Sequence, residues 1–183
     1  MANTNPTKVI TGVVRLSYEH VWEPAAVNDD GKMKYSASLI IPKTDAKTVN
    51  AINAAVDAAL KKDAHKFGGK IPNKAALKLP LRDGDAERED DEAYRNSYFI
   101  NANSDRKPEI VGQDLEPIED QSEVYSGCYV RVSVNFYAFN RNGNKGVACG
   151  LGNIKKIRDG EPLSSRTSAA DDFATDDDED FLA

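Results

Sequence analysis

The sequence contains few of the residues that usually build metal, disulfide or nucleophilic sites. Its 183 residues include two cysteines, Cys128 and Cys149, and two histidines, His20 and His65. These four residues do not show the spacing of a zinc site, and both cysteines lie in apolar, strand-like segments. We therefore expect two buried, reduced thiols, no bound metal and no cofactor.

The motifs of common enzyme classes are absent as well. No Ser/His/Asp or Cys/His arrangement is visible in the sequence. The glycines of GNKGVACGLG lie within a predicted strand, not in the strand-to-helix turn that binds dinucleotides. The sequence therefore shows no motif of these enzyme classes.

Long apolar runs are also missing. No stretch of about 18 apolar residues is present, so we expect no membrane span. The beginning of the chain, MANTNPTKVITG, lacks a basic region followed by an apolar one, so we expect no signal peptide and a location in the cytoplasm. A content of 40 % hydrophobic and 30 % charged residues is typical of a globular domain with a real core.

The net charge of −6 is unevenly distributed along the chain. Residues 164–183 contain seven acidic residues and one arginine, and the segment Asp83–Glu92 (DGDAEREDDE) contains the same numbers. The rest of the chain carries a net charge of +6. Because the position of the charge decides which partner is attracted, the negative total does not exclude a polyanionic partner.

Most of the chain has the composition and alternation of β-strands. The link between the first two strands, residues 20–32, reads as a loop, and the strands do not alternate with helices, which argues against a parallel sheet. We expect a small, mostly antiparallel barrel or sandwich with one main helix. The predicted strands are Lys8–Glu19, Lys32–Ile41, Ala76–Leu81, Ser97–Ala102, Pro108–Val111, Cys128–Arg141 and Lys145–Ile157.

One helix is predicted between the second strand and the acidic segment. Thr44 is a plausible N-cap, apolar residues follow at helical spacing from Val49 to Leu60, and Gly68-Gly69 ends the helix. At the other end of the chain, the residues after Pro162 are rich in Ser, Ala and Asp and have little to bury. We therefore expect a domain over residues 1–163 and a disordered acidic tail over residues 164–183.

Asn142-Gly143 predicts a two-residue hairpin turn between the two clearest strands. In that register Arg141 pairs with Asn144, and one face of the first strand is apolar and belongs to the core. The other face places large side chains opposite small residues of the second strand. Its pairs are Phe139 with Gly146, Tyr137 with Ala148, Asn135 with Gly150 and Ser133 with Gly152, and Tyr129, Arg131 and Arg141 continue the same face.

This second hairpin face has the chemistry of a nucleic-acid surface. Aromatic rings stack on bases, arginines pair with phosphates, and the glycines leave room for a flat base. Aromatic rings over cross-strand glycines also simply repair sheet packing, but arginines at both ends favour an exposed, binding face. The predicted site comprises Tyr129, Arg131, Asn135, Tyr137, Phe139, Arg141, Lys145, Lys32, Lys34 and Trp22.

The supporting members of this site have simpler explanations too. Lys32 and Lys34 lie on the polar face of a strand, where a solvated surface is the common explanation. Trp22 either stacks on a base or caps the core. A different function is suggested by the acidic segment, because Asp83, Asp85 and Glu87 are possible ligands of a metal-dependent phosphodiesterase. A dense local run of acids in a loop is more often solvated, so this is the second hypothesis, and a structural or scaffold protein is the third.

Five segments of the chain are distinctive in combination. They are KYSASLIIPK (34–43), LKLPLRDGD (77–85), YRNSYFINANS (94–104), YSGCYVRVSVNFYAFN (125–140) and GNKGVACGLGNIKKIRDGEPL (143–163). Together they resemble a family of bacteriophage proteins, formerly a domain of unknown function, that bind single-stranded DNA, and the resemblance extends over nearly all of residues 8–163. It implies an OB-type fold, sequence-tolerant binding of single-stranded DNA, a role in phage replication or recombination in the host cytoplasm, and a protein that is not an enzyme.

The end of the chain, DDFATDDDEDFLA, resembles the acidic tails with terminal apolar residues that such proteins carry. Under this reading the tail competes with DNA for a basic groove and, once displaced, docks on phage or host replication and recombination proteins. A solubilising tail is the alternative, although it would not need apolar residues at 173, 181 and 182. The docking residues are Asp176, Asp177, Asp178, Glu179, Asp180 and Phe181. Exposed strand edges also make a homodimer an expectation.

Overall fold

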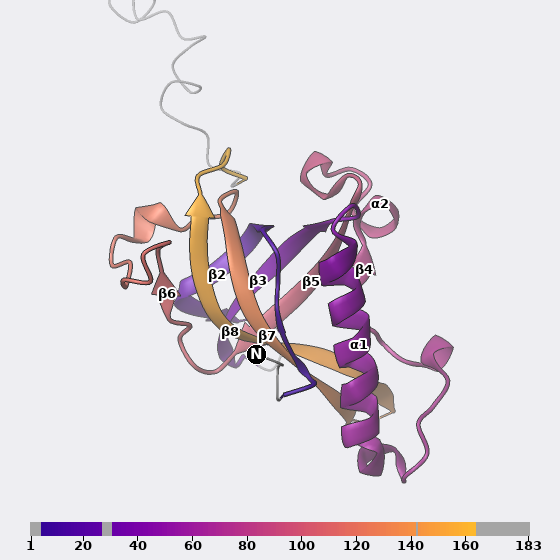
Figure 1. Cartoon of the computed structure of the whole chain (residues 1–183). Coiled ribbons are helices and arrows are strands. Elements are labelled where there is room, and N and C mark those ends of the chain that lie inside the picture. The colour runs from indigo at the N-terminus through magenta and orange to yellow at the C-terminus, as the bar shows by residue number, and fades with distance from the viewer. Residues whose placement is uncertain (1–4, 27–30, 142, 164–183) are drawn as a thin grey trace, which may run out of the picture.

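The computed structural model in Figure 1 describes residues 5–26, 31–141 and 143–163, and five long strands dominate it. Their pairings follow a closed circuit in which β2 pairs with β3, β3 with β5, β5 with β8, β8 with β7 and β7 again with β2. All of these pairings are antiparallel except that of β5 with β8. The circuit is therefore a small β-barrel. Its strands are β2 (Val14–Ala26), β3 (Met33–Pro42), β5 (Ser97–Ser104), β7 (Tyr129–Arg141) and β8 (Asn144–Arg158).

Short elements decorate this barrel. The main helix is α1 (Ala46–Lys62), and a single further helical turn forms α2 (Gly84–Glu87). No helix in the part of the chain that the structure describes is both long and apolar enough to cross a membrane. The short strands are β1 (Lys8–Ile10) beside β7, β4 (Arg82–Asp83) beside β5 and β6 (Ile110–Val111) beside β8, and 3-10 turns occur at Ala64–Phe67, Lys74–Ala76, Glu92–Tyr94 and Gln121–Glu123.

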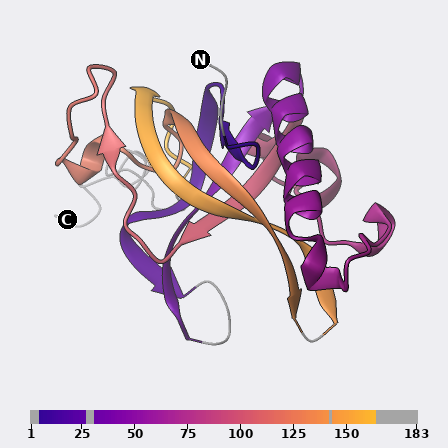
Figure 2. The same ribbon diagram turned by 60° about the horizontal axis from the view of Figure 1, so that its bottom comes forward.

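The core lies between the inner faces of the strands and α1, which runs along one side of the barrel (Figure 2). The side chain of Asp45 caps the helix by accepting a hydrogen bond from the backbone N–H of Thr48, so the N-cap is Asp45 and not Thr44. The apolar face predicted for the helix is buried. The helix contributes Ile52, Ala55, Val56, Ala59 and Leu60 to the core.

A second, smaller apolar cluster lies on the outside of the barrel. It consists of Ile40 of β3, Phe99 of β5 and Tyr94, whose ring meets the Phe99 ring edge to face at 5.1 Å. The Tyr94 hydroxyl lies 3.1 Å from both the Ser17 and the Ser38 hydroxyls. These contacts fix the acidic segment 83–92 against the outer face of β3 and β5.

The sequence predicted the fold class correctly, namely a mostly β protein with one main helix. The hairpin register is confirmed from Arg141–Asn144 to Val134–Leu151. Beyond that point two irregularities shift the register, so Val132 pairs with Ile154. Cys128 and Cys149 are free and buried, as expected. The predicted tail from residue 164 onward lies outside the described residues, as does Asn142 of the turn, whereas Gly143 has the left-handed φ of 82° that such a turn requires.

Two strand predictions were wrong in their bounds. The first predicted strand is broken at residues 11–13, because the chain turns there toward α1 and the Gly12 N–H donates to the Thr48 hydroxyl at 2.9 Å. The predicted loop after it is largely strand, since β2 runs to Ala26 and passes Pro24 with the help of two register shifts against β3. Bulges of this kind allow a proline within a strand.

The predicted strand Ala76–Leu81 was also wrong. The segment contains the end of a 3-10 turn, followed by a single bridge between Lys78 and Gly146. The argument against a parallel sheet holds for most of the barrel, but β5 and β6 each run parallel to β8. A sequence with no βαβ alternation still allows such pairs, because the connections pass around the barrel.

Candidate nucleic-acid interface

A continuous polar row crosses the outer face of four neighbouring strands. Ser36 of β3 pairs with Asn103 of β5, Asn103 lies beside Gly150 of β8, and Gly150 pairs with Asn135 of β7. Side chains alternate between the two faces of a strand, so these residues point away from the core. Their chain neighbours on the inner face are buried, namely Ala37, Ala102, Cys149 and Phe136.

A hollow of about 520 Å³, here called the outer groove, lies over the β3 and β5 part of this row. Tyr18 stands at its rim with 61 % of its surface exposed and with a left-handed φ of 45°, which is uncommon for a residue with a side chain. Arg88 forms another wall, and its guanidinium carbon lies 5.3 Å from the centre of the Phe99 ring. The groove is lined by Tyr18, His20, Ala26, Ser36, Ala37, Ser38, Arg88, Asn101, Ala102 and Asn103.

The outer groove contains side chains of the kinds that bind single-stranded nucleic acid. The hydroxyl of Ser36 and the amides of Asn101 and Asn103 offer hydrogen bonds to base edges, whereas the Ser38 hydroxyl is buried and bonded to Tyr94. Tyr18 offers a ring for stacking at the rim, and a cationic side chain suits a phosphate. The groove is open to solvent, which fits a flexible strand better than a small molecule that must be enclosed.

The hairpin face continues from the groove toward the turn. Tyr137 is 38 % exposed and pairs with Ala148, and a methyl group placed on its diagonal neighbour Gly150 would lie 3.9 Å from its ring. The space beside this ring is therefore open. The other two glycine spaces are filled, because the backbone of Lys78 occupies the place beside Gly146 and Ser133 occupies the place beside Gly152.

The half of the hairpin face farther from the turn is engaged within the molecule. The Tyr129 ring lies between two arginines, with the guanidinium of Arg158 4.2 Å and that of Arg15 5.6 Å from its centre. Arg131 donates from Nε to the backbone carbonyl of Thr11 at 2.9 Å. The structure thus divides the predicted face into an open half near Tyr137 and an engaged half near Tyr129 and Arg131. Asn135, in the open half, is exposed but its Oδ1 lies 2.8 Å from the Thr7 hydroxyl.

The remaining predicted residues lie at the hairpin turn, on β7 or at the start of β3. Arg141 and Lys145 are exposed beside the hairpin turn, and Phe139 is half-buried. Lys34 lies on the same outer strand face as Ser36, two residues earlier, and Lys32 is exposed just before β3.

Trp22 lies apart from the outer groove. Its ring packs against the core, its Nε1–H donates to the carbonyl of Val124 at 2.9 Å, and Lys107 lies over the ring at 5.7 Å. Trp22 therefore caps the core, which was one of its two predicted roles.

The acidic segment forms a wall beside the outer groove, and its first carboxylates are paired. Lys43 binds Asp83 and Asp85 at 2.8 Å each, and these bonds lower the pKa of both aspartates. Arg82 pairs with Glu87 at 2.5 Å. Among the described residues no group of three His, Cys, Asp or Glu side chains is placed to hold a metal ion. The ligands that a phosphodiesterase would need are thus held by lysine and arginine.

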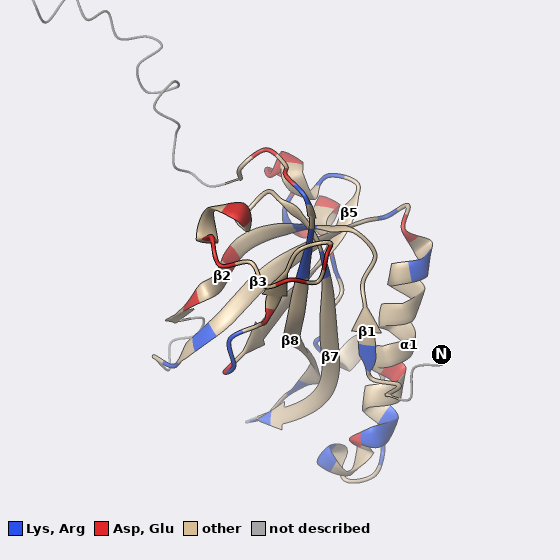
Figure 3. Cartoon of the chain, turned by 60° about the vertical axis from the view of Figure 1, so that its left-hand side comes forward, with Lys and Arg blue, Asp and Glu red and all other residues tan. Residues whose placement is uncertain are grey.

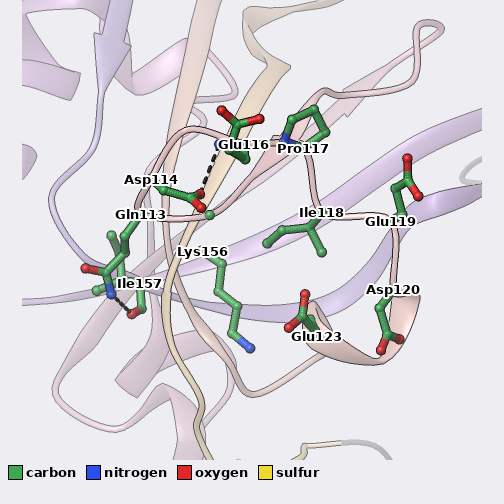
Figure 4. Close-up of a pocket in the computed structure, with 11 residues that line it drawn as sticks. Gln113, Asp114, Glu116, Pro117, Ile118, Glu119, Asp120, Glu123, Lys156 and Ile157 are labelled. Carbon is green, nitrogen blue, oxygen red and sulfur yellow. Dashed lines mark hydrogen bonds between the residues drawn. The ribbon is translucent and has the colours of Figure 1, made fainter.

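Another hollow, of about 720 Å³, lies away from the outer groove and is unsuited to phosphate (Figure 4). Its one basic residue, Lys156, is paired with Asp159 at 2.5 Å. The carboxylates around it would repel a polyanion, so we do not place nucleic acid there. They are those of Asp114, Glu116, Glu119, Asp120 and Glu123.

Sequence reasoning missed most of the outer groove. Asn101 and Asn103 alternate with apolar residues in SYFINANS, and Ser36 and Ser38 share a face with Lys34, so a signal for a polar outer face was present. The pairing of β3 with β5 across the helix was needed to bring these residues together. Nothing in the local sequence indicated that the Arg88 guanidinium would pack over the Phe99 ring.

The closed circuit β2–β3–β5–β8–β7, with its parallel β5–β8 closure, is that of an OB fold. Solved structures with this fold are similar over nearly their whole length. The single-stranded DNA-binding protein from bacteriophage Enc34, in complex with ssDNA, has a TM-score of 0.77 and 23 % identity over 90 % of this chain and 97 % of its own. Gp2.5, a single-stranded DNA-binding protein encoded by bacteriophage T7, has a TM-score of 0.60 and 13 % identity over 93 % of this chain and 94 % of its own.

The family is given by the sequence comparison. Residues 7–182 match the model of the Enterobacter phage Enc34 ssDNA-binding protein family, and the chain belongs to that family. A curated relative, "Putative protein p50" of Acyrthosiphon pisum secondary endosymbiont phage 1, is 30 % identical over 186 residues, covering 96 % of this chain and 99 % of the relative. The resemblance found in the sequence is thereby confirmed.

Proposed function

We propose that the protein binds single-stranded DNA with little sequence preference in the outer groove and along the open half of the hairpin face. One observation carries the proposal: the groove lies over β3 and β5, the second and third strands of the barrel circuit. OB folds bind oligonucleotides on this face. Membership of a family named for ssDNA binding supports the same function.

Each part of the surface has a role in this proposal. Tyr18 and Tyr137 stack on bases, and the polar row between them contacts base edges. Lysines and arginines around the groove and the hairpin turn meet phosphates, and this contribution falls with salt because binding releases counterions. The phosphate-binding residues are Lys32, Lys34, Arg88, Arg141 and Lys145. Tyr129, Arg131 and Phe139 support the face, and Trp22 caps the core nearby.

We assign the residues after Leu163 to an acidic tail that competes with DNA. Leu163 packs against the outer cluster of Ile40, Tyr94 and Phe99, and its N–H donates to the carbonyl of Ser126 at 2.8 Å. The segment that follows therefore starts beside the outer groove. Its carboxylates and Phe181 lie outside the described residues. When DNA displaces them, they dock on replication or recombination proteins in the cytoplasm of the host.

The first test is the ring of Tyr137. Stacking on an aromatic ring stabilises binding by about 1–3 kcal/mol per base, so Y137A should weaken binding of a labelled oligo-dT by about tenfold or more. Y137F keeps the ring and should bind like the parent. Fluorescence anisotropy over a salt series measures both variants. If Y137A binds as tightly as the parent, the hairpin face is not part of the site, and if the parent itself does not bind at low salt, the proposed function is wrong.

The proposal includes no catalysis. Incubation of labelled single-stranded DNA with the protein and magnesium or manganese should leave the strand intact. Cleavage that D83N/D85N abolishes would instead support the phosphodiesterase.

A further inference from the structure

Two oppositely charged surfaces lie on opposite sides of the barrel. The segment 112–123 forms one of them, here called the acidic pole, and the C-terminal end of α1 with residues 63–71 forms the other, here called the basic pole (Figures 1 and 2). The charge colouring shows lysines gathered at the end of α1 (Figure 3). The proposed DNA-binding face does not need either surface.

The acidic pole combines unpaired carboxylates with an apolar hollow. Within the described chain Glu116, Glu119 and Glu123 form no ion pair, and Figure 4 shows Glu119 and Glu123 at the edge of the large acidic hollow. Pro117 and Ile118 are shared with a neighbouring hollow of about 400 Å³, lined largely by apolar side chains. At that hollow Leu115 is 66 % exposed and Trp22 forms part of the wall.

The basic pole has the matching composition. Lys61, Lys62 and Lys70 are exposed and form no ion pair within the described chain. Ile71 follows directly and is 38 % exposed. The acid nearest to them, Asp63, is already used, because it accepts the N–H of Ala138 at 3.0 Å and lies 3.8 Å from Lys66. An apolar residue within a positively charged rim thus faces solvent.

The negative charge of the acidic pole limits which partner can bind to it. DNA and the chain's own acidic tail are both repelled by it. A two-fold dimer through this surface would place like charges against each other, because such an interface is self-complementary. The basic pole of a second copy fits this surface, because it supplies three lysines and the apolar side chain of Ile71.

We propose that copies of this protein associate head to tail, with Lys61, Lys62 and Lys70 of one copy against Glu116, Glu119 and Glu123 of the next. Ile71 then contacts the hollow beside Leu115. A contact between two different surfaces does not close at two copies and continues as a row. When neighbouring copies are bound to one DNA strand, this contact makes binding to a long strand cooperative. This part of the inference rests on the proposed function.

A weak contact is sufficient for this effect. Two copies bound at neighbouring positions are held at high effective concentration, so an interface too small for a stable dimer in dilute solution still adds to affinity on the strand. The contact is largely electrostatic at its rim, so it weakens as salt rises.

Charge reversal tests the pairing. E116K/E119K/E123K and K61E/K62E/K70E should each reduce cooperative binding to poly-dT at least tenfold. The sixfold variant that carries both sets should recover it, because the charges are again complementary. An equimolar mixture of the two threefold variants should also recover it. Affinity for a short oligo-dT that holds a single copy separates this contact from DNA binding itself, and thermal unfolding confirms that each variant is folded.

The outcomes are distinguishable. If the parent fails to bind the short oligonucleotide, the proposed function fails. If it binds the short strand but both threefold variants keep the parent's cooperativity, or the sixfold variant stays as defective as they are, the head-to-tail contact is overturned. A second measurement uses cysteine cross-linking on poly-dT, since both native cysteines are buried. I71C/L115C should give a ladder of oligomers, and dimers from L115C alone would point to a symmetric contact and overturn the proposal.

Discussion

At the scale of single residues, Tyr94 combines complete burial with two hydrogen bonds of its hydroxyl group. It is completely buried although it follows the most acidic part of the described chain, and Phe99 and Arg88 lie against its ring. Its hydroxyl joins Ser17 of β2 to Ser38 of β3. One side chain therefore connects two barrel strands to the wall of the outer groove.

Replacing Tyr94 by phenylalanine should lower the free energy of unfolding by about 1–2 kcal/mol, because two buried serine hydroxyls lose their partner while the ring stays in place. Urea denaturation followed by circular dichroism measures the change. Y18F is the matched control, since Tyr18 is exposed, and it should leave stability unchanged. Equal stability of Y94F and the parent would mean that the hydroxyl contributes nothing to the fold.

Cys149 illustrates how burial removes reactivity. Burial raises the pKa of its thiol and also that of Cys128, so neither thiolate forms near neutral pH. The two residues act as small apolar side chains of the barrel core. This agrees with the expectation from their apolar surroundings in the sequence.

At the scale of elements, the acidic segment 83–92 is a fixed wall. Lys43 and Arg82 hold it through ion pairs, and Arg88 of the segment itself packs over the Phe99 ring. Glu89 and Asp90 form no ion pair within the described chain. They line a hollow of about 480 Å³ that shares Tyr18 with the outer groove, so their charge acts directly on a strand in that groove.

Neutralising this wall should strengthen DNA binding. E89Q/D90N/E92Q removes three negative charges within about a Debye length of the groove and should raise the affinity for a short oligo-dT about threefold at low salt. The gain should disappear at high salt. The control D114N/E116Q/E119Q makes the same charge change away from the groove and should have a much smaller effect. An equal gain in both variants would show that only the total charge matters.

The sequence predicted those elements whose signals are local. The turn at Gly143 and the alternation on both sides of it were enough to give eight residue pairs of the hairpin correctly. The buried face of α1 followed from its apolar spacing in the same way. The bulges that shift Val132 onto Ile154 come from the curvature of the closed barrel, which no local pattern contains.

The candidate site was predicted less completely for the same reason. Lys34, Asn135 and Tyr137 could be proposed from the sequence because they lie on clear alternating strands. The pairing of Ser36 with Asn103 joins residues separated by the helix and the acidic segment, so the groove between them was not foreseen. The partners that engage Arg131 and Tyr129, namely Thr11, Arg15 and Arg158, also come from distant positions.

At the scale of the whole molecule, the end of the described chain is firmly attached. The guanidinium of Arg15 donates to the carbonyl of Glu161 at 2.6 Å, and Leu163 packs beside the outer groove. A segment that begins at a fixed point near the groove reaches it at high effective concentration. The proposed competition between residues 164–183 and DNA is therefore consistent with the position of Leu163.

A chain that ends at Leu163 should keep the melting temperature of the full chain, because the contacts of the barrel lie before that residue. It should also bind oligo-dT about tenfold more tightly at low salt, since the competing carboxylates are gone. Differential scanning calorimetry and anisotropy measure the two effects. A lower melting temperature would place residues 164–183 within the folded domain, and unchanged affinity would remove the competition from the proposal.

The closure of the barrel also governs how the chain acquires its structure during synthesis. β1 and β2 pair with β7, which lies more than a hundred residues later in the chain, and β5 pairs with β8 although β6 and β7 lie between them in the sequence. A nascent chain that has reached Ser104 therefore has β2, β3 and β5 but neither of the strands that close the ring. The inner apolar face of these three strands stays exposed until β7 and β8 have been synthesised and Arg158 has left the ribosome. Contacts so distant in sequence make folding slow and late, so this protein depends on the last third of its chain before any of it is stable.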